Sequence, residues 1–324
     1  MTQRRTLVAS VAAGLAAPAL APTLAQGQGT GPNATFVRAN ANTIGIVSGG
    51  IDGTYARFAA DLAAVLDDGD YLRVLPILGK GSRQNLLDLR WLRNIDAAIV
   101  QADVLATARA ERLFSGLEHQ VHYVAKLYDE EIHVLARRDI ASLNDLTDKP
   151  VNLDVRGSGT AMTATLLFAG LGVAVQPRHD TQADALEKLM RGEIAALVYV
   201  AGKPARLFTS IQADAGLRLL PIPLSPALLE TYVPARFTSA DYPQVVPAGE
   251  LVETLAVGAV LAVYNHTIAE RRDRLVRFAN SLSAKFDAFL RPPRHPKWRE
   301  VNLAAQVPGW TRFGGARPAV ASRG

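Results

Sequence analysis

The chain has 324 residues, a length that allows two compact domains and a large buried core. Hydrophobic residues make up 49% and charged residues 20% of the sequence, which excludes a wholly disordered chain, a collagen-like repeat and a multi-span membrane protein. The absence of cysteine from the sequence excludes disulfides, thiolate metal sites and a cysteine nucleophile. The formal net charge is +5, but residues 1–25 carry +2 and residues 291–324 carry +6, which leaves about −3 for the body. A mildly acidic body lacks the basic stripe that follows phosphates, so we expect no nucleic-acid partner.

The first 25 residues have the features of an export signal. Arg4 and Arg5 precede a stretch rich in Ala, Leu and Val over residues 7–20, and residues 23–25 offer a small-residue cleavage site. The apolar stretch is too short and too rich in alanine to be a comfortable membrane span. The paired arginines fit a twin-arginine signal, and ordinary Sec export is equally consistent. We therefore expect a periplasmic protein with a flexible leader over residues 26–41.

From residue 43 onward, short apolar runs alternate with helical spacing, which is typical of an α/β fold with mainly parallel strands. Helices are expected between most of the strands. The helix after the first strand puts Phe58 and Leu62 on one face, and the last long helix does the same with Leu275 and Phe278. The predicted strands cover residues 43–48, 72–78, 97–100, 122–128, 132–137, 151–153, 195–200, 217–221 and 255–263.

Five loops that follow predicted strands combine small and polar residues. In open α/β sheets, ligands sit at the carboxyl ends of strands and on helix N-termini, where backbone N–H groups are free. Each loop taken alone also has a structural explanation, as a tight connection in which Ser82, Asp103 or Ser158 caps the following helix. The loops cover residues 49–55, 79–82, 101–103, 156–160 and 202–204.

The order of these loops along the chain resembles that of the TAXI family of solute receptors. Those receptors are the extracytoplasmic binding subunits of one branch of the tripartite, ATP-independent TRAP transporters. The resemblance runs from about residue 43 to residue 290, and residues 127–171 are its most specific part. The segments that carry it are Gly49–Tyr55, Gly-x-Gly-Ser-x-x-Asn at Gly79–Asn85, Ala97–Asp103, Leu127-Tyr128 with Ile132–Arg137, Gly157–Thr160 and Gly202-Lys203-Pro204.

The resemblance implies an α/β fold like that of the type II periplasmic binding proteins, in which two α/β lobes are joined by two hinge strands. Lobe 1 is expected over residues 42–137 plus 256–290, lobe 2 over residues 138–255, and a basic C-terminal arm over residues 291–324. Such a receptor closes on a small organic carboxylate, for example glutamate or 2-oxoglutarate, and delivers it to a TRAP-type membrane permease. We expect a monomer without cofactor, metal or catalytic residues.

Groups from both lobes are candidates for holding the ligand. Ser158, Thr160 and the free N–H groups near Gly159 are expected to hold one carboxylate at a helix N-terminus. The opposite lobe offers hydroxyl and amide groups, and Asp103 either caps its own helix, which is favoured, or receives an amino group of the ligand. The candidate ligand-binding residues are Gly50, Tyr55, Lys80, Gly81, Ser82, Gln101, Asp103, Arg156, Ser158, Gly159, Thr160, Tyr199, Gly202 and Pro204.

Two candidate residues depart from the family's pattern. Lys80 stands in Gly79-Lys80-Gly81-Ser82, where the family usually has Thr-Gly-Gly-Ser, and Arg156 occupies a position that is often neutral. A cation that faces the cleft would favour a more anionic ligand, and Arg156 would then add a charge-assisted pair. Both side chains could equally point outward, so their direction stays open.

Three alternatives remain beside this hypothesis. An ABC-importer receptor of the same fold would differ in its permease, and a receptor that has lost transport would serve signalling. A periplasmic enzyme acting on a carboxylate would need catalytic machinery. His119 and His122 have no carboxylate partner at metal-site spacing, and Ser158 lies outside a Gly-x-Ser-x-Gly elbow. The sequence therefore favours a binding protein over an enzyme.

Overall fold

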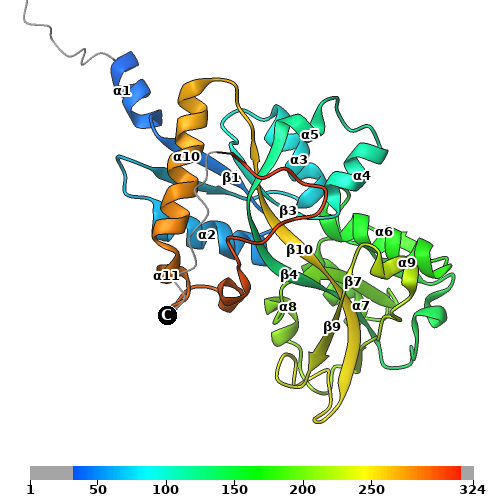
Figure 1. Cartoon of the computed structure of the whole chain (residues 1–324). Coiled ribbons are helices and arrows are strands. Elements are labelled where there is room, and N and C mark those ends of the chain that lie inside the picture. The colour runs from blue at the N-terminus through cyan, green and yellow to red at the C-terminus, as the bar shows by residue number, and fades with distance from the viewer. Residues whose placement is uncertain (1–31, 315–324) are drawn as a thin grey trace, which may run out of the picture. The chain divides into compact units, whose positions relative to one another are not determined.

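The computed structural model describes residues 32–314 (Figure 1). The chain divides into two compact units, one ending at Ala41 and one beginning at Asn42. The first contributes helix α1 (Pro32–Asn40). This helix differs from the expected flexible leader, because Pro32 presets a helical φ at the first position and the following residues tolerate a helix. The predicted export signal and the last ten residues lie outside the described residues.

The second unit contains a mixed sheet whose strands, within residues 32–314, number ten. Parallel strands lie on both sides of two long antiparallel strands, β4 and β10. The shorter strands β8 (Leu217–Leu219) and β9 (Val233–Thr238) pair with β4 and β10 respectively. In sheet order the others are β2 (Arg73–Ile77), β1 (Thr43–Val47), β3 (Ala97–Gln101), β10 (Leu251–Tyr264), β4 (Val121–Arg137), β7 (Ala196–Ala201), β5 (Pro150–Asn152) and β6 (Gln176–Arg178).

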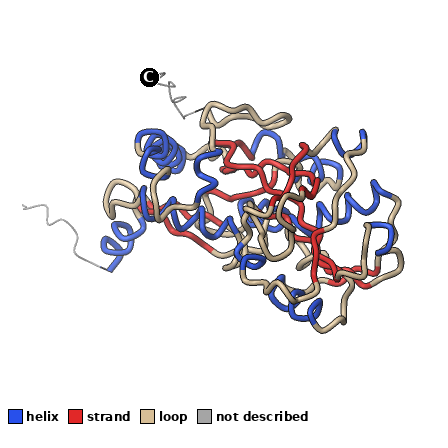
Figure 2. The backbone as a smooth tube through the Cα atoms, turned by 90° about the horizontal axis from the view of Figure 1, so that it is seen from below, coloured by secondary structure: helices blue, strands red, loops and turns tan. Residues whose placement is uncertain are grey.

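Helices connect the strands on both sides of the two long strands (Figure 1). We call β1–β3 with α2–α4 the first half and β5–β7 with α6 and α7 the second half; β4 and β10 run through both (Figure 1). Figure 2 shows the strands in red with the helices in blue around them. The helices are α2 (Thr54–Leu66), α3 (Ser82–Trp91), α4 (Val104–Ala110), α5 (Leu117–Gln120), α6 (Gly159–Leu171), α7 (Gln182–Met190), α8 (Arg206–Thr209), α9 (Pro226–Leu229), α10 (Ala269–Ala284) and α11 (Phe286–Phe289), with 3-10 turns η1 (Leu143–Leu146) and η2 (Pro296–Glu300).

This topology confirms the predicted α/β fold, but the expectation of mainly parallel strands is wrong, because β4 and β10 pair antiparallel with every neighbour they have. The predicted strands over residues 122–128 and 132–137 prove to be one strand, β4, because Glu130 and Glu131 continue the antiparallel pairing with β10. Strands β6 and β9 were not predicted. Both contain a proline, and β6 is exposed along its whole length, so neither shows a buried pattern in the sequence.

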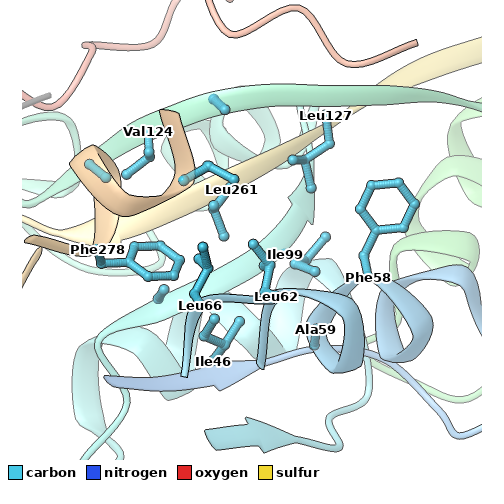
Figure 3. Packing of buried hydrophobic residues seen from close by; sticks show 14 of the residues in the cluster. Ile46, Phe58, Ala59, Leu62, Leu66, Ile99, Val124, Leu127, Leu261 and Phe278 are labelled. Atoms are coloured by element: carbon cyan, nitrogen blue, oxygen red, sulfur yellow. The ribbon is translucent and has the colours of Figure 1, made fainter. Parts of the chain in front are cut away.

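Each half has its own hydrophobic core. In the first half, Phe58 and Leu62 of α2 pack against Ile99 of β3 and Phe278 of α10 (Figure 3). In the second half, residues of β4, β7 and α6 form another cluster, which includes Ile132, Val134, Leu167, Phe168 and Val198. Burying a side chain of this size stabilises the fold by roughly 1.5 to 3 kcal/mol. Residues 32–314 contain two further clusters, and one of them includes Met162 of α6 together with first-half residues such as Val100.

The C-terminal segment packs on the body through Trp298 and Trp310. Trp298 is fully buried, stacks on Phe58 at a centroid distance of 4.3 Å, and donates from Nε1 to Asp61 Oδ2 at 2.9 Å. Trp310 donates from Nε1 to the carbonyl of Ala102 at 2.8 Å. Across residues 32–314, the helices are all too short or too polar to cross a membrane.

Candidate ligand-binding site

A cavity of about 70 Å³ lies where the strand-end loops of the two halves meet. Its wall includes ten of the predicted residues: Gly50, Tyr55, Lys80, Gly81, Ser82, Gln101, Ser158, Gly159, Thr160 and Tyr199. Four of the five predicted loops thus reach one cavity, whereas residues 202–204 do not line it. The same wall also contains residues that sequence reasoning missed: Gly49, Gly53, Thr54, Glu130, Asp154, Val200 and Ala201.

Asn85 fixes the loop that forms the first-half wall. Its Oδ1 accepts from the Gly81 N–H at 3.2 Å, and its Nδ2 donates to the carbonyls of Ser48 and Ile99 at 2.6 and 2.8 Å. Gly81 has a φ of 104°, a conformation that favours glycine. The Gly-x-Gly-Ser-x-x-Asn run therefore ties three strand ends together through one buried amide.

Ser82 and Gln101 form the next part of this wall. The Gln101 N–H donates to Ser82 Oγ at 2.9 Å, and Ser82 Oγ donates to Gln101 Oε1 at 3.0 Å. Ser82 Oγ also lies 3.5 Å from the Tyr55 hydroxyl. Ser82 therefore does not cap α3, whose N-cap residue is Gly81. This arrangement aims the Gln101 amide at the second half, where Nε2 donates to Thr163 Oγ1 at 3.0 Å.

The N-terminus of α6 forms the second-half wall. Ser158 caps this helix as predicted, since its Oγ accepts from the Ala161 N–H at 3.0 Å. Thr160 Oγ1 accepts from the Val200 N–H at 3.1 Å, which fixes α6 against β7. Within the described chain, the N–H groups of Gly159 and Thr160 donate to no acceptor. A 13-residue helix with free N–H groups at a cavity wall attracts an anion.

The two halves touch each other beside the cavity. Gln84 N–H donates to the Gly157 carbonyl at 3.0 Å. A β-carbon at Gly159 would overlap Gln101 Oε1 and would lie 2.5 Å from Ser82 Oγ, so only glycine permits this approach. The two halves are therefore joined beside the cavity by contacts between residues far apart in the sequence.

Two acidic side chains line the cavity, Glu130 of β4 and Asp154 after β5. Glu130 is 3% exposed, and burial raises its pKa well above the usual value, although the Tyr55 hydroxyl, which donates to Oε1 at 2.5 Å, lowers it. Burial also raises the pKa of Asp154, whose φ of 73° lies in the left-handed region. Asp154 directly follows a predicted strand, so its position in the sequence could have revealed it.

Asp103 lies outside the cavity wall and bridges the halves instead. The prediction that Asp103 caps α4 is wrong, because its φ of −72° and ψ of −18° are helical and its side chain makes no capping bond. Asp103 Oδ2 accepts from the hydroxyls of Tyr232 and Thr163 at 3.2 and 3.4 Å. Burial raises its pKa to about 6, and its Oδ1 has no hydrogen-bond partner in residues 32–314.

Three other predicted residues are not brought to the cavity. Arg156 is exposed and lines a separate groove with Arg83, so it does not face the cavity. Lys80, the other cation whose direction was open, is exposed and lines the cavity. Gly202 is buried, and a β-carbon there would lie 3.0 Å from the Tyr128 ring. Its role is thus close packing. Pro204 is exposed and away from the cavity wall.

Several solved structures are similar to the chain at low sequence identity. The chain is similar to the alkanesulfonate-binding protein SsuA from Xanthomonas axonopodis pv. citri bound to MOPS, with 15% identity over 86% of this chain and 85% of that one and a TM-score of 0.48. It is similar to the periplasmic aliphatic sulphonate binding protein SsuA from Escherichia coli, with 17% identity, coverage of 79% and 72%, and a TM-score of 0.47. It is also similar to the P235GK mutant of ArgBP from T. maritima, with 16% identity, coverage of 79% and 93%, and a TM-score of 0.45.

The sequence itself also matches a family model. The matched segment begins in β1 and ends in α10, and so includes every loop that lines the cavity. The match covers residues 46–277, well over half of the chain. The chain therefore belongs to the NMT1-like family.

Proposed function

We propose that this protein is an extracytoplasmic receptor that captures a small organic carboxylate between its two halves and delivers it to a TRAP-type membrane permease. One observation carries the proposal: Gly159 and Thr160, whose N–H groups have no acceptor within residues 32–314, line a cavity with residues of both halves. An α6 N-terminus in this position attracts an anion, and the sheet places it at the carboxyl ends of parallel strands.

The available contacts suffice for a useful affinity. The dipole of α6 contributes about 0.3 to 1 kcal/mol, and up to ~2 kcal/mol when partly buried. Each hydrogen bond to a charged oxygen, from the N–H groups or from the Ser158 hydroxyl, contributes roughly 1.5 to 3 kcal/mol. A few such contacts reach about −8 kcal/mol, which corresponds to micromolar binding. The proposed binding requires no metal or organic cofactor.

Ligand binding would be coupled to a change from an open to a closed arrangement of the two lobes. In this proposal, residues 42–137 plus 256–290 form one lobe and residues 138–255 form the other. The chain would bend where β4 and β10 pass between the two cores. Because ligand contacts come from both lobes, the ligand stabilises the closed arrangement more than the open one.

The expected export signal supports the periplasm as the site of action, and the resemblance to TAXI receptors supports a TRAP permease as the partner. A thermal-shift screen of the purified protein tests the binding step, with glutamate, 2-oxoglutarate, simple carboxylates and amino acids as ligands. We expect at least one acid to raise the melting temperature and to be recovered unchanged. Consumption of that acid would reject a receptor and support an enzyme.

Uptake of the labelled acid by cells tests the proposed permease partner. Cells that express this receptor together with TRAP permease subunits should take up the labelled acid, and cells that lack either component should not. Uptake that instead requires an ATP-hydrolysing permease would replace the proposed partner by an ABC importer.

A further inference from the structure

A second hollow of about 350 Å³ adjoins the cavity described above. We call the first the inner cavity and the second the outer cavity. They share wall residues Gly50, Gly53, Lys80, Asp154 and Tyr199, so the two hollows lie side by side. The remaining wall of the outer cavity consists of Ile51, Asp52, Gly79, Val155, Thr181, Gln182, Ala183 and Leu207.

The volume of the inner cavity limits what it can hold. A water molecule needs about 10 to 15 Å³ of such volume, so the inner cavity, at about 70 Å³, accommodates roughly five to seven water-sized atoms. The ammonium, α-carbon and carboxylate of an α-amino acid are about five non-hydrogen atoms and match this limit. A whole glutamate or a whole 2-oxoglutarate exceeds it. The rest of any such ligand must therefore extend into the outer cavity.

The inner cavity has polar groups of both signs. The free N–H groups of Gly159 and Thr160 suit a carboxylate, whereas Glu130 and Asp154 suit a donor or a cation. Neither acid forms an ion pair within residues 32–314. A simple carboxylate would satisfy only the helix N-terminus and would face two acids. An α-ammonium group beside the carboxylate would donate hydrogen bonds to both acids and would stabilise their ionised forms, which burial alone disfavours.

The outer cavity favours an apolar side chain. Ile51, Val155 and Leu207 contribute aliphatic surface, and Ile51 is 71% exposed. Among the described residues that line either cavity, Lys80 is the single cation, while Asp52 and Asp154 are both acidic. A second carboxylate would therefore meet more negative than positive charge in the outer cavity. An apolar group would cover the aliphatic surface instead.

We propose that the ligand is an α-amino acid with an apolar side chain, whose ammonium and carboxylate lie in the inner cavity and whose side chain lies in the outer cavity. This inference rests on the proposed function and names the ligand class of the same site. Glu130 and Asp154 bind the ammonium, and the N-terminus of α6 binds the carboxylate.

A matched set of ligands tests the inference by isothermal titration calorimetry. L-Leucine has both features, 4-methyl-2-oxopentanoate and 4-methylpentanoate lack the ammonium, and L-glutamate has a charged side chain. We expect leucine to bind at least tenfold more tightly than each of the other three. Equal or tighter binding of the keto acid overturns the role of the ammonium, and equal or tighter binding of glutamate overturns the apolar side chain. Binding of no carboxylate at all overturns the proposed function as well.

Variants of the cavity walls test which residues cause the preference for an apolar α-amino acid. Asp154→Asn should weaken leucine at least fivefold more than it weakens 4-methyl-2-oxopentanoate, and Leu207→Gln should lower the ratio of leucine to alanine affinity at least fivefold. Leu92→Gln, at an exposed position outside both cavity walls, is the matched control. If Asp154→Asn does not fold, Glu130→Gln, which retains an acceptor for Tyr55, makes the same test. A uniform loss for leucine and the keto acid in the folded variant overturns the assignment.

Discussion

The hydroxyl of Tyr55 on α2 donates a 2.5 Å hydrogen bond to Glu130 Oε1 on β4. Both residues line the inner cavity, and Glu130 lies on one of the two strands that run through both halves. The bond therefore connects the wall of the first half to the strand that joins the halves. It also gives a buried carboxyl group a donor that its position requires.

Tyr55→Phe should weaken ligand binding several-fold and lower the free energy of unfolding by about 0.5 to 1.5 kcal/mol. The ring remains and keeps its packing, but Glu130 loses the donor that lowers its pKa. Calorimetric titration and chemical denaturation measure the two effects. Unchanged values for both would show that the hydrogen bond contributes to neither.

Gly159→Ala should reduce ligand affinity at least tenfold, because its β-carbon would overlap Gln101 Oε1 and hold the halves apart. Small-angle X-ray scattering should show no compaction of this variant on addition of ligand. Gly170→Ala, in the same helix, is the control, since its β-carbon meets only the Leu228 side chain, at 3.3 Å. Wild-type affinity in Gly159→Ala would mean that the halves do not need this contact to hold the ligand.

Asp103 should make stability depend on pH. Its pKa of about 6 in the fold lies above the usual 3.8, so the folded state favours the protonated carboxyl. The stabilisation linked to this residue is fully present below pH 3.8 and is lost as the pH rises through about 6. Asp103→Asn keeps an acceptor for Tyr232 and has no charge to bury.

We expect Asp103→Asn to be more stable than the wild type at pH 7, by at most about 3 kcal/mol, and the difference to shrink as the pH falls towards 4. Urea denaturation at several pH values measures this difference. A difference of the opposite sign at pH 7 would show that the ionised carboxylate stabilises the contact between the halves.

Lys297 should stabilise the join between the C-terminal segment and β4. Its Nζ is 2.7 Å from Glu131 Oε1 and also donates to the Asp129 carbonyl, and its side chain is 3% exposed. Lys297→Met should lower the free energy of unfolding by about 3 to 5 kcal/mol, because Glu131 would be buried without its cation. The double variant with Glu131→Gln should recover much of that loss, which a double-mutant cycle by denaturation measures. If the losses of unfolding free energy in the two single variants simply add in the double variant, the two side chains are not coupled.

From the sequence, the positions of the site's loops could be predicted better than the roles of its acidic side chains. Glycines and capping residues such as Gly81 and Ser158 mark strand ends by local conformational needs, and local needs are visible in a single sequence. Glu130 was missed as a site residue because it lies in the middle of a strand, where only the pairing of β4 with β10 turns it towards the cavity. Asp103 was assigned to a cap because its partner Tyr232 is remote in the sequence and comes from the other half.

The amide signals of Gly159 and Thr160 test the central claim most directly. In a ¹H–¹⁵N spectrum of the labelled protein titrated with the tightest-binding acid of the screen, both signals should move downfield as the carboxylate accepts their hydrogen bonds, in step with calorimetric saturation. Saturation that leaves both signals in place and moves those of another region would contradict the claim that the N-terminus of α6 holds the acid.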